Sequence, residues 1–503
     1  MSAVSRRAWL LAALGGAVLA TRAARAETLP APDTDTLLLN RSSFGIRQAD
    51  MDRIRQIGRS AYLEEQLNPE TLDNSAVDSF ISQNFNTLNL SADALLVLDQ
   101  NADPANMQRV ELVRELRLAT LYRAWFSSRQ LYEVMVDFWS NHFNIHQLNG
   151  ALRALKTVDD RDVIRPHALG NFRDLLHASA KSPAMLYYLD NYVSTAAAPN
   201  ENYARELLEL HTLGVDGGYT QTDVQEVARI LTGWTIYLGR RYSGTPQHGT
   251  FQFNLTQHDT GAKTFLGTDF PAGAGLEEGE RLLDMLAVHP ATAQFIATKL
   301  VRRFISDTPP AAAVSAVSAA FSQSNGDIRS TLRVLFNTPE FLAGADQKFK
   351  RPWEFALGAL RHTEASLTNA TGLNSLLRSL DALGQAPFDW EPPNGYPDSA
   401  GYWATTNGLL NRWNQTLQLT ESSVPSIRVD ITALLAGANT PASIVDQLAN
   451  RVLHRTLSSA DRDSFIAYFG ASTPTTLLSA STLATRTPGL LALLLSSAYF
   501  QNR

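Results

Sequence analysis

The chain has 503 residues, of which 44% are hydrophobic and 18% charged, and this composition excludes disordered and fibrous classes of protein. It contains no cysteine, so disulfide bonds, thiolate metal sites and cysteine nucleophiles are excluded. The net charge is −6 and no basic block is present, so nucleic acid is not expected as a partner.

The first residues have the pattern of a bacterial export signal. Arg6 and Arg7 precede an Ala-rich apolar run over residues 8–20, which is too short to cross a bilayer as a helix, and residues 24–26 (Ala-Arg-Ala) form a cleavage pattern. The paired arginines and the weakly hydrophobic run favour the twin-arginine pathway over the general secretory pathway. We therefore predict a signal peptide over residues 1–26 and a periplasmic or secreted protein with no transmembrane segment after its removal.

Most of the remaining chain has apolar residues at helical spacing. The predicted helices, in chain order, are Glu111–Trp125, Leu131–His142, Asn202–Leu213, Thr222–Tyr237, Leu282–Ile305, Ile328–Phe336, Phe355–Ala365, Asn407–Leu419 and Ala442–Leu457. Residues 250–255 alternate between apolar and polar and residues 263–267 follow a short turn, which predicts a β-hairpin. We expect a mainly α fold: one large multi-helix domain over 27–503 with a small β-hairpin insertion near 250–267, either undivided or with a C-terminal helical subdomain from about residue 345.

The segment 199–237 has the highest density of polar residues. It predicts a helix, a Gly-rich turn and a second helix. Asn200 or Asn202 can cap the first helix, Gly214 lies where a left-handed cap is needed, and Thr222 begins a capping box for the second helix. These features predict two well-terminated amphipathic helices.

Two interpretations of this segment stay open. Its polar residues can be solvated helix faces with an ion pair between Arg205 and Glu209. In the other interpretation Asn202, Glu206 and Asp223 face a cleft, where the carboxylates act in proton transfer or hold Ca²⁺ or Mg²⁺ through oxygen ligands.

Further candidates lie in three other segments. His142 ends a strongly apolar helix, where it is either a satisfied core residue or a catalytic base. His258 and Asp259 lie in the turn of the expected hairpin, where they either stabilise the turn or converge on a site. The cations Arg205, Lys263 and Arg351 are candidates for substrate binding.

Aromatic residues are concentrated among the prolines and glycines of residues 387–413. Trp390 and Trp403 belong to this group and are candidates for substrate binding, because flat aromatic faces stack on sugar rings. Burial as core under a loop is the alternative, and it is favoured for the group as a whole. No nucleotide-binding glycine motif, nucleophile elbow or HExxH zinc motif is present in the sequence.

The chain from Leu37 to the C-terminus resembles the bacterial domain of unknown function 1800 family. The resemblance rests on Leu38–Gly45, Asp137–Phe143, Pro199–Gly214, Gly233-Trp234, His258-Asp259, Lys263–Gly267 and Lys350–Pro352. Residues 386–404 depart from the family pattern, since Tyr396 stands where tryptophan is usual. The resemblance implies a largely helical exported protein but no particular activity. It also implies a partner or shared pathway, because genes of the family often neighbour those of an exported phosphatase-like or sulfatase-like family.

Two functions follow from these patterns. The first is an exported enzyme acting on an envelope or extracellular polymer such as a polysaccharide, through a carboxylate and histidine site. Its catalytic candidates are Glu206, Asp223, His142, His258 and Asp259. The alternative is a non-catalytic secreted binding or assembly protein that works with a co-exported partner. Convergence of the carboxylates and histidines in one pocket would support the enzyme hypothesis.

Overall fold

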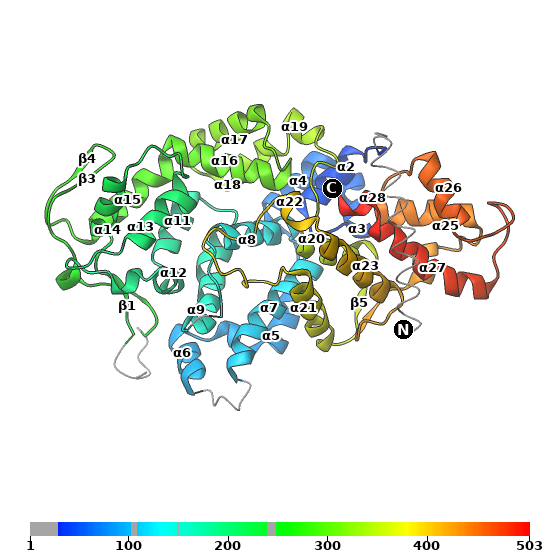
Figure 1. Cartoon of the computed structure of the whole chain (residues 1–503), viewed down its shortest axis with the longest axis horizontal. Coiled ribbons are helices and arrows are strands. Elements are labelled where there is room, and N and C mark those ends of the chain that lie inside the picture. The colour runs from blue at the N-terminus through cyan, green and yellow to red at the C-terminus, as the bar shows by residue number, and fades with distance from the viewer. Residues whose placement is uncertain (1–28, 102–107, 149, 239–247) are drawn as a thin grey trace.

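The computed structural model in Figure 1 describes residues 29–101, 108–148, 150–238 and 248–503; the predicted signal peptide lies outside the described residues. The α-helices are α2 (Thr34–Ser42), α3 (Gln48–Ile57), α4 (Arg59–Leu67), α5 (Ser75–Asn84), α6 (Ala92–Asn101), α7 (Gln108–Phe126), α8 (Gln130–His142), α9 (Leu152–Val158), α10 (Arg165–His167), α11 (Phe172–Ala180), α12 (Pro183–Tyr188), α13 (Glu201–Glu206), α14 (Gln221–Ile230), α15 (Leu276–Val288), α16 (Pro290–Phe304), α17 (Ala311–Gln323), α18 (Ile328–Leu335), α19 (Pro339–Leu342), α20 (Pro352–His362), α21 (Thr371–Leu383), α22 (Ala400–Trp403), α23 (Thr406–Thr420), α24 (Ile431–Leu435), α25 (Pro441–Leu448), α26 (Ser459–Ala467), α27 (Ala480–Ser496) and α28 (Ala498–Gln501). The prediction of a mainly α fold is confirmed.

Short helical turns and strands complete the described part. The 3₁₀ turns are η1 (Pro69–Thr71), η2 (Asn86–Asn89), η4 (Asn191–Val193) and η6 (Leu255–Gln257), and the π-helical turns are η3 (Asp159–Ile164), η5 (Leu207–Thr212) and η7 (Ala449–Leu453). The strands are β1 (Trp234–Ile236), β2 (Phe251–Phe253), β3 (Lys263–Phe265), β4 (Thr268–Phe270), β5 (Ser366–Leu367) and β6 (Ile427–Arg428). They pair in sequence order as three two-stranded antiparallel sheets.

The predicted pairing of the hairpin is wrong, although β structure does occur near 250–267. Strand β2 pairs with β1, which lies inside the predicted helix Thr222–Tyr237, and β3 pairs with β4. The cause lies at Gly233, whose φ is +76° and whose missing Cβ would lie 2.5 Å from the carbonyl oxygen of Asn254. A left-handed glycine ends the helical turn and brings the two strands together. Helix α14 therefore stops at Ile230 and leaves Trp234 free to begin a strand.

Two other expectations at helix ends need correction. The predicted helix Leu282–Ile305 is two helices, because Pro290 follows His289 in extended backbone, and His289 caps α16. The N-cap of α14 is Thr220 and not Thr222, with Asp223 completing the capping box. The predicted left-handed cap at Gly214 is confirmed, with a φ of +80°.

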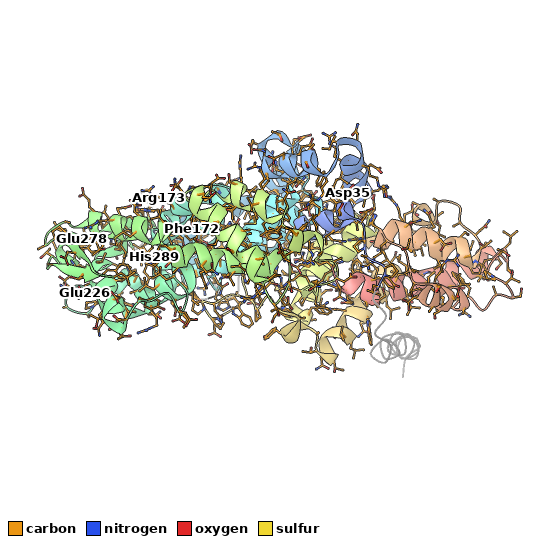
Figure 2. All side chains as sticks on the ribbon, turned by 90° about the horizontal axis from the view of Figure 1, so that it is seen from above. Asp35, Phe172, Arg173, Glu226, Glu278 and His289 are labelled. Atoms are coloured by element: carbon orange, nitrogen blue, oxygen red, sulfur yellow. The ribbon has the colours of Figure 1, made fainter. Side chains whose placement is uncertain are left out.

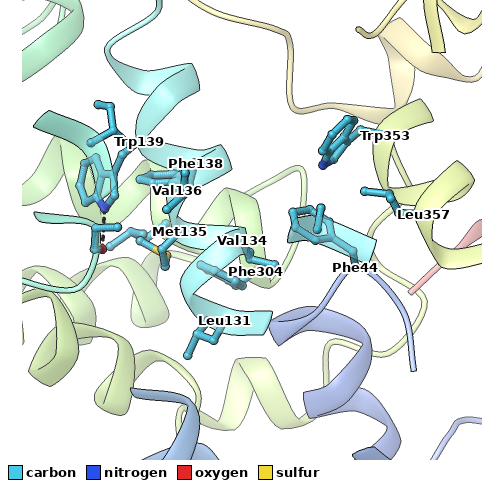
Figure 3. Close-up of a cluster of buried hydrophobic side chains, with 14 of the residues drawn as sticks. Phe44, Leu131, Val134, Met135, Val136, Phe138, Trp139, Phe304, Trp353 and Leu357 are labelled. Atoms are coloured by element: carbon cyan, nitrogen blue, oxygen red, sulfur yellow. Dashed lines mark hydrogen bonds between the residues drawn. The ribbon is translucent and has the colours of Figure 1, made fainter. Parts of the chain in front are cut away.

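Helix α8 runs through the centre of the hydrophobic core (Figure 3). Its apolar side chains pack with residues from α16, α20 and the segment after α2; those labelled in Figure 3 are Phe44, Leu131, Val134, Met135, Val136, Phe138, Trp139, Phe304, Trp353 and Leu357. Trp139 Nε1 donates a hydrogen bond to the Ala168 carbonyl at 3.0 Å. Burial of these side chains fixes the orientation of α8. Its polar residue Asn141 then faces residues 384–399.

One cluster of buried hydrophobic residues extends from Leu37 to Phe500. The division of residues 27–503 into a body and a C-terminal subdomain stays a prediction. Within the described ranges, no helix combines the length and the apolar character that a membrane span needs.

Candidate functional site

The residues predicted to form one site fall into two groups. Asp223, His258, Asp259 and Lys263 belong to α14, β3 and the turn between β2 and β3, at one end of the elongated molecule (Figure 1). Figure 2 labels Glu226 of α14 and Glu278 of α15 at the same end. The second group is spread over α8 (His142), α13 (Asn202, Arg205 and Glu206), the N-cap of α20 (Arg351) and residues 390–403 (Trp390 and Trp403).

Asp223 is occupied by two structural tasks. Its carboxylate accepts hydrogen bonds from the Thr220 backbone N–H at 2.8 Å and hydroxyl at 2.6 Å, which caps α14. The other carboxylate oxygen accepts from the Leu266 N–H at 2.9 Å and so holds the β3–β4 turn. Burial acts to raise the pKa of Asp223, but these hydrogen bonds outweigh it and lower the pKa. The geometry favours a structural role.

The other residues at this end are also paired. Asp259 forms a two-point ion pair with Arg229, at 2.8 and 3.2 Å. The ammonium of Lys263 lies 2.6 Å from the Glu278 carboxylate, and both side chains are buried. His258 Nδ1 lies 2.9 Å from the Thr232 carbonyl oxygen. These contacts tie the turn between β2 and β3 to α14 and α15.

In the middle of the molecule, two asparagines fasten residues 384–399, which we call the docked loop, to α8. Asn141 donates to the Tyr396 carbonyl at 3.0 Å and accepts from the Tyr396 N–H at 2.7 Å. Asn144 donates to the carbonyls of Trp390 and Pro392 at 2.9 and 2.8 Å. Gly395 has a φ of +74°, and a Cβ there would lie 2.2 Å from the Asn141 carbonyl oxygen. The docked loop therefore contacts α8 backbone to backbone.

A cavity of about 50 Å³ lies between α8 and the docked loop. Phe44, Phe388 and Tyr396 line it, together with Ser140 and Trp353. The Ser140 hydroxyl and the Trp353 indole N–H are buried and make no hydrogen bond in the described part of the chain. The lining of this cavity is mainly apolar, but the cavity has room for an ordered water that could bond to these two groups.

A buried arginine cluster contacts Asp137, one of the residues that line this cavity. Arg351, predicted to bind substrate, lies 2.7 Å from Asp137 and 3.1 Å from Glu354. The Glu354 carboxylate also forms ion pairs with Arg303 and with Arg503, whose guanidinium nitrogen lies 2.8 Å from it. Burial, followed by the charges of Arg351 and Arg503, moves the pKa of Arg303 well below its usual value. The contacts of Arg351 are therefore those of an internal ion-pair network.

His142 lies on another side of α8 in an aromatic environment. Its Nε2 is 3.1 Å from the His211 carbonyl oxygen, and the two imidazole rings are 6.1 Å apart. Burial, followed by the charge of Lys299, lowers the pKa of His142 well below the usual value and that of His211 to about 3. Burial also lowers the pKa of Lys299 to about 8. Both imidazoles are therefore neutral at neutral pH.

Sequence reasoning missed His211 and Lys299 as neighbours of His142. The available signal was a lysine on a mostly apolar stretch of α16 and a histidine next to buried leucines in η5. The three residues come from segments far apart in the chain. Local periodicity alone therefore does not indicate that they are neighbours in the folded chain.

Glu206 differs from the other catalytic candidates because it is half-buried and makes no hydrogen bond or ion pair within the described ranges. Burial, followed by the charge of Glu209, raises its pKa against the opposing effect of Arg205. The charge of Glu206 in turn contributes to a raised pKa of Tyr188, after burial. The Tyr188 hydroxyl donates to the Glu391 carbonyl, which places Glu206 beside the docked loop.

The neighbours of Glu206 on α13 have other partners. Asn202 donates a long hydrogen bond to the Leu189 carbonyl at 3.4 Å. Arg205 contacts Glu201 at 3.4 Å and Gln221 at 3.0 Å, so the expected pair with Glu209 is wrong. Among the residues the structure describes, no group of three or more His, Asp or Glu side chains could hold a metal ion. A Ca²⁺ or Mg²⁺ site at Asn202, Glu206 and Asp223 stays a prediction.

The aromatic residues of the docked loop and α22 are partly core and partly surface. Trp403 is buried and its indole N–H donates to the Pro397 carbonyl at 2.7 Å. Trp390 is half-buried, with its ring 5.0 Å from Tyr396 and 5.9 Å from Tyr402. Tyr402 is 48% exposed. Trp403 is therefore part of the core, whereas Trp390 and Tyr402 present aromatic surface at the docked loop.

Comparison with known proteins identifies the family. A family model described as "protein of unknown function (DUF1800)" matches residues 37–502, so the chain belongs to that family. No curated protein and no solved structure matches the chain.

Proposed function

We propose that this member of the family is an exported enzyme that acts on a polysaccharide of the envelope or of the extracellular space, with Glu206 as its proton-transfer group. The observation that carries the proposal is the state of the Glu206 carboxyl: half-buried, without a protein partner, and with a raised pKa. A carboxyl with a raised pKa is a stronger candidate than an ordinary glutamate for delivering a proton to a leaving group.

The surroundings of Glu206 support a sugar substrate. The docked loop lies beside it through Tyr188, and the same loop carries Trp390, next to the exposed ring of Tyr402. Aromatic faces next to a proton donor suit a sugar ring, which stacks on the ring while its glycosidic oxygen meets the acid. Export through the predicted twin-arginine signal would bring the protein to such polymers.

The test is a screen of envelope polysaccharides for released reducing ends with purified mature protein. We expect Glu206→Gln to lower the rate by about 100-fold, the usual size of a general-acid effect, with polymer binding retained. Glu277→Gln is the matched control, because Glu277 is an exposed carboxylate in the first turn of α15. Equal rates for wild type and Glu206→Gln on a cleaved polymer would contradict the proposal.

The alternative function is a non-catalytic binding or assembly protein with a co-exported partner, such as a phosphatase-like or sulfatase-like protein. The structural contacts of Asp223, His258, Asp259 and Lys263 favour it, because most catalytic candidates are already paired. It predicts polymer or partner binding without cleavage. Metal analysis of protein purified without chelator tests the Ca²⁺ or Mg²⁺ prediction in both cases.

A further inference from the structure

A polar basin of about 560 Å³ opens between the start of α2, helix α3 and the segment that follows α25. Arg55, Arg451 and Arg455 line it, together with Asp33 and His454. Amide and hydroxyl groups complete the lining, from Gln48, Gln447, Asn450 and Thr456. The basin is separate from the docked loop, whose cavity shares none of these residues.

The charged residues of the basin differ in whether they have ion-pair or hydrogen-bond partners. Arg455 is neutralised by Asp346, at 2.6 and 2.8 Å, and Asp33 caps α2 by accepting from the Thr36 N–H. Arg451 donates to Gln48 and lies 3.3 Å from Glu364. Arg55 is exposed and makes no hydrogen bond or ion pair with the described residues. The basin therefore has a guanidinium that no hydrogen bond or ion pair of the described residues engages, although the charge of Arg55 acts on Asp35 at longer range.

His454 adds a neutral side chain to the wall of the basin. Its Nε2 is buried without a hydrogen-bond partner within the described ranges and therefore does not face the open basin, so Nδ1 is the ring nitrogen that an anion in the basin can reach. Burial, followed by the charges of Arg451 and Arg55, lowers the pKa of His454 to about 4, so the ring is neutral at neutral pH. A neutral imidazole carries one N–H group, and an oxyanion can accept a hydrogen bond from it.

The backbone around His454 is unusual as well. His454 has a φ of +51°, the left-handed region that bulky residues rarely adopt, and it follows directly after the π-helical turn η7. Left-handed non-glycine residues and π-helical turns recur at functional sites. Here both features occur at a residue that lines the basin.

We propose that this basin binds a phosphate group, with Arg55 and Arg451 as charged donors and His454 Nδ1–H as a neutral donor. Guanidinium groups match phosphate oxygens in geometry and charge. The group can be free phosphate or the phosphodiester of a lipid headgroup, since both present the same oxygens. The proposal is independent of Glu206 and of any catalytic activity.

The test measures binding of inorganic phosphate by calorimetry, with chloride at equal ionic strength as reference, and co-sedimentation with phosphatidylglycerol vesicles. We expect Arg55→Gln and His454→Asn each to weaken binding about tenfold, the loss typical of one charge-assisted or buried hydrogen bond. Asparagine tolerates the left-handed backbone. Arg53→Gln is the control, because Arg53 lies on the same helix but pairs with Glu65.

The two arms separate the sources of the phosphate. Binding of phosphate in solution assigns a free anion, whereas binding of vesicles alone assigns a lipid headgroup, and both support the basin if Arg55→Gln weakens them. Absence of binding in both arms, or equal weakening by Arg53→Gln and Arg55→Gln, would overturn the proposal. Unfolding midpoints without phosphate show that the variants are folded, and Glu206→Gln should bind phosphate like the wild type.

Discussion

A single buried histidine can make the stability of the folded protein depend on pH. The pKa of His211 falls from 6.5 to about 3 on folding, because burial disfavours the charged ring. The unfolded chain therefore takes up the proton first as the pH falls. The contribution of His211 to stability is complete above pH 6.5 and is lost progressively between pH 6.5 and about 3, by up to about 1.4 kcal/mol per pH unit.

We predict that His211→Met flattens this pH dependence. Methionine has a similar volume and does not titrate, so the slope of the unfolding free energy between pH 6 and about 4 should fall by about one proton per molecule. Urea denaturation at a series of pH values measures the slope. An unchanged slope would show that His211 is protonated in the folded chain over this range.

Glu354 holds three arginines, and its removal should be costly. Arg303, Arg351 and Arg503 all contact its Oε1 atom in a fully buried setting. Glu354→Gln leaves these cations without their shared counter-ion, and we expect a loss of about 3–5 kcal/mol in the free energy of unfolding. Chemical denaturation measures it. Glu65→Gln, which breaks the exposed pair with Arg53, should cost far less than Glu354→Gln, and similar losses for both variants would contradict the prediction.

At the scale of elements, the sequence predicted helices well where periodicity is local. Residues 131–142 match α8, whose apolar residues recur at helical spacing and are buried. The sequence did not predict the end of α14, because the deciding contact is between Gly233 and Asn254, which lie apart in the chain. The break before Pro290 was readable in principle, since proline disfavours helix at the preceding residue.

The candidate site shows the same division. Glu206 was predicted as a candidate from its place on a polar helix stripe, and the structure leaves it without a partner. The pairing of Asn141 with Tyr396 could not be predicted, because it joins residues 255 positions apart. Asp223 illustrates the converse error: its position three residues after Thr220 signalled a helix cap, and that role occupies the carboxylate.

The docked loop depends on Gly395. Gly395→Ala places a methyl group against the Asn141 carbonyl, so we expect the loop to leave α8 and to become a site of limited proteolysis. Gly384→Ala is the matched control: Gly384 also has a positive φ, of +80°, but no atom lies within 4 Å of its Cβ position. Both variants carry the left-handed strain of about 1–2 kcal/mol, and only Gly395→Ala should expose residues 384–399. Equal protease resistance of the two would show that close contact does not hold the loop.

At the scale of the whole molecule, distant parts of the chain meet in one core. The backbone N–H of Arg503 donates to the Lys348 carbonyl at 2.8 Å, and its side chain reaches Glu354. Arg41, near the start of the described chain, donates to the carbonyls of Phe304 and Ile305. The core is therefore complete only when segments from both ends have been made. Without cysteine, no disulfide can form later to stabilise it.

This dependence on segments far apart in the chain is compatible with the predicted twin-arginine export, which carries folded proteins. We predict that Arg6→Lys combined with Arg7→Lys stops export, so that protein with residues 1–26 still attached accumulates in the cytoplasm. Cell fractionation and mass determination follow the loss of residues 1–26. Arg22→Lys with Arg25→Lys is the control, because it conserves the same charge outside the arginine pair and should be exported normally. Continued export of the Arg6 and Arg7 variant would assign the leader to the general secretory pathway, and the chain would then have to fold after crossing the membrane.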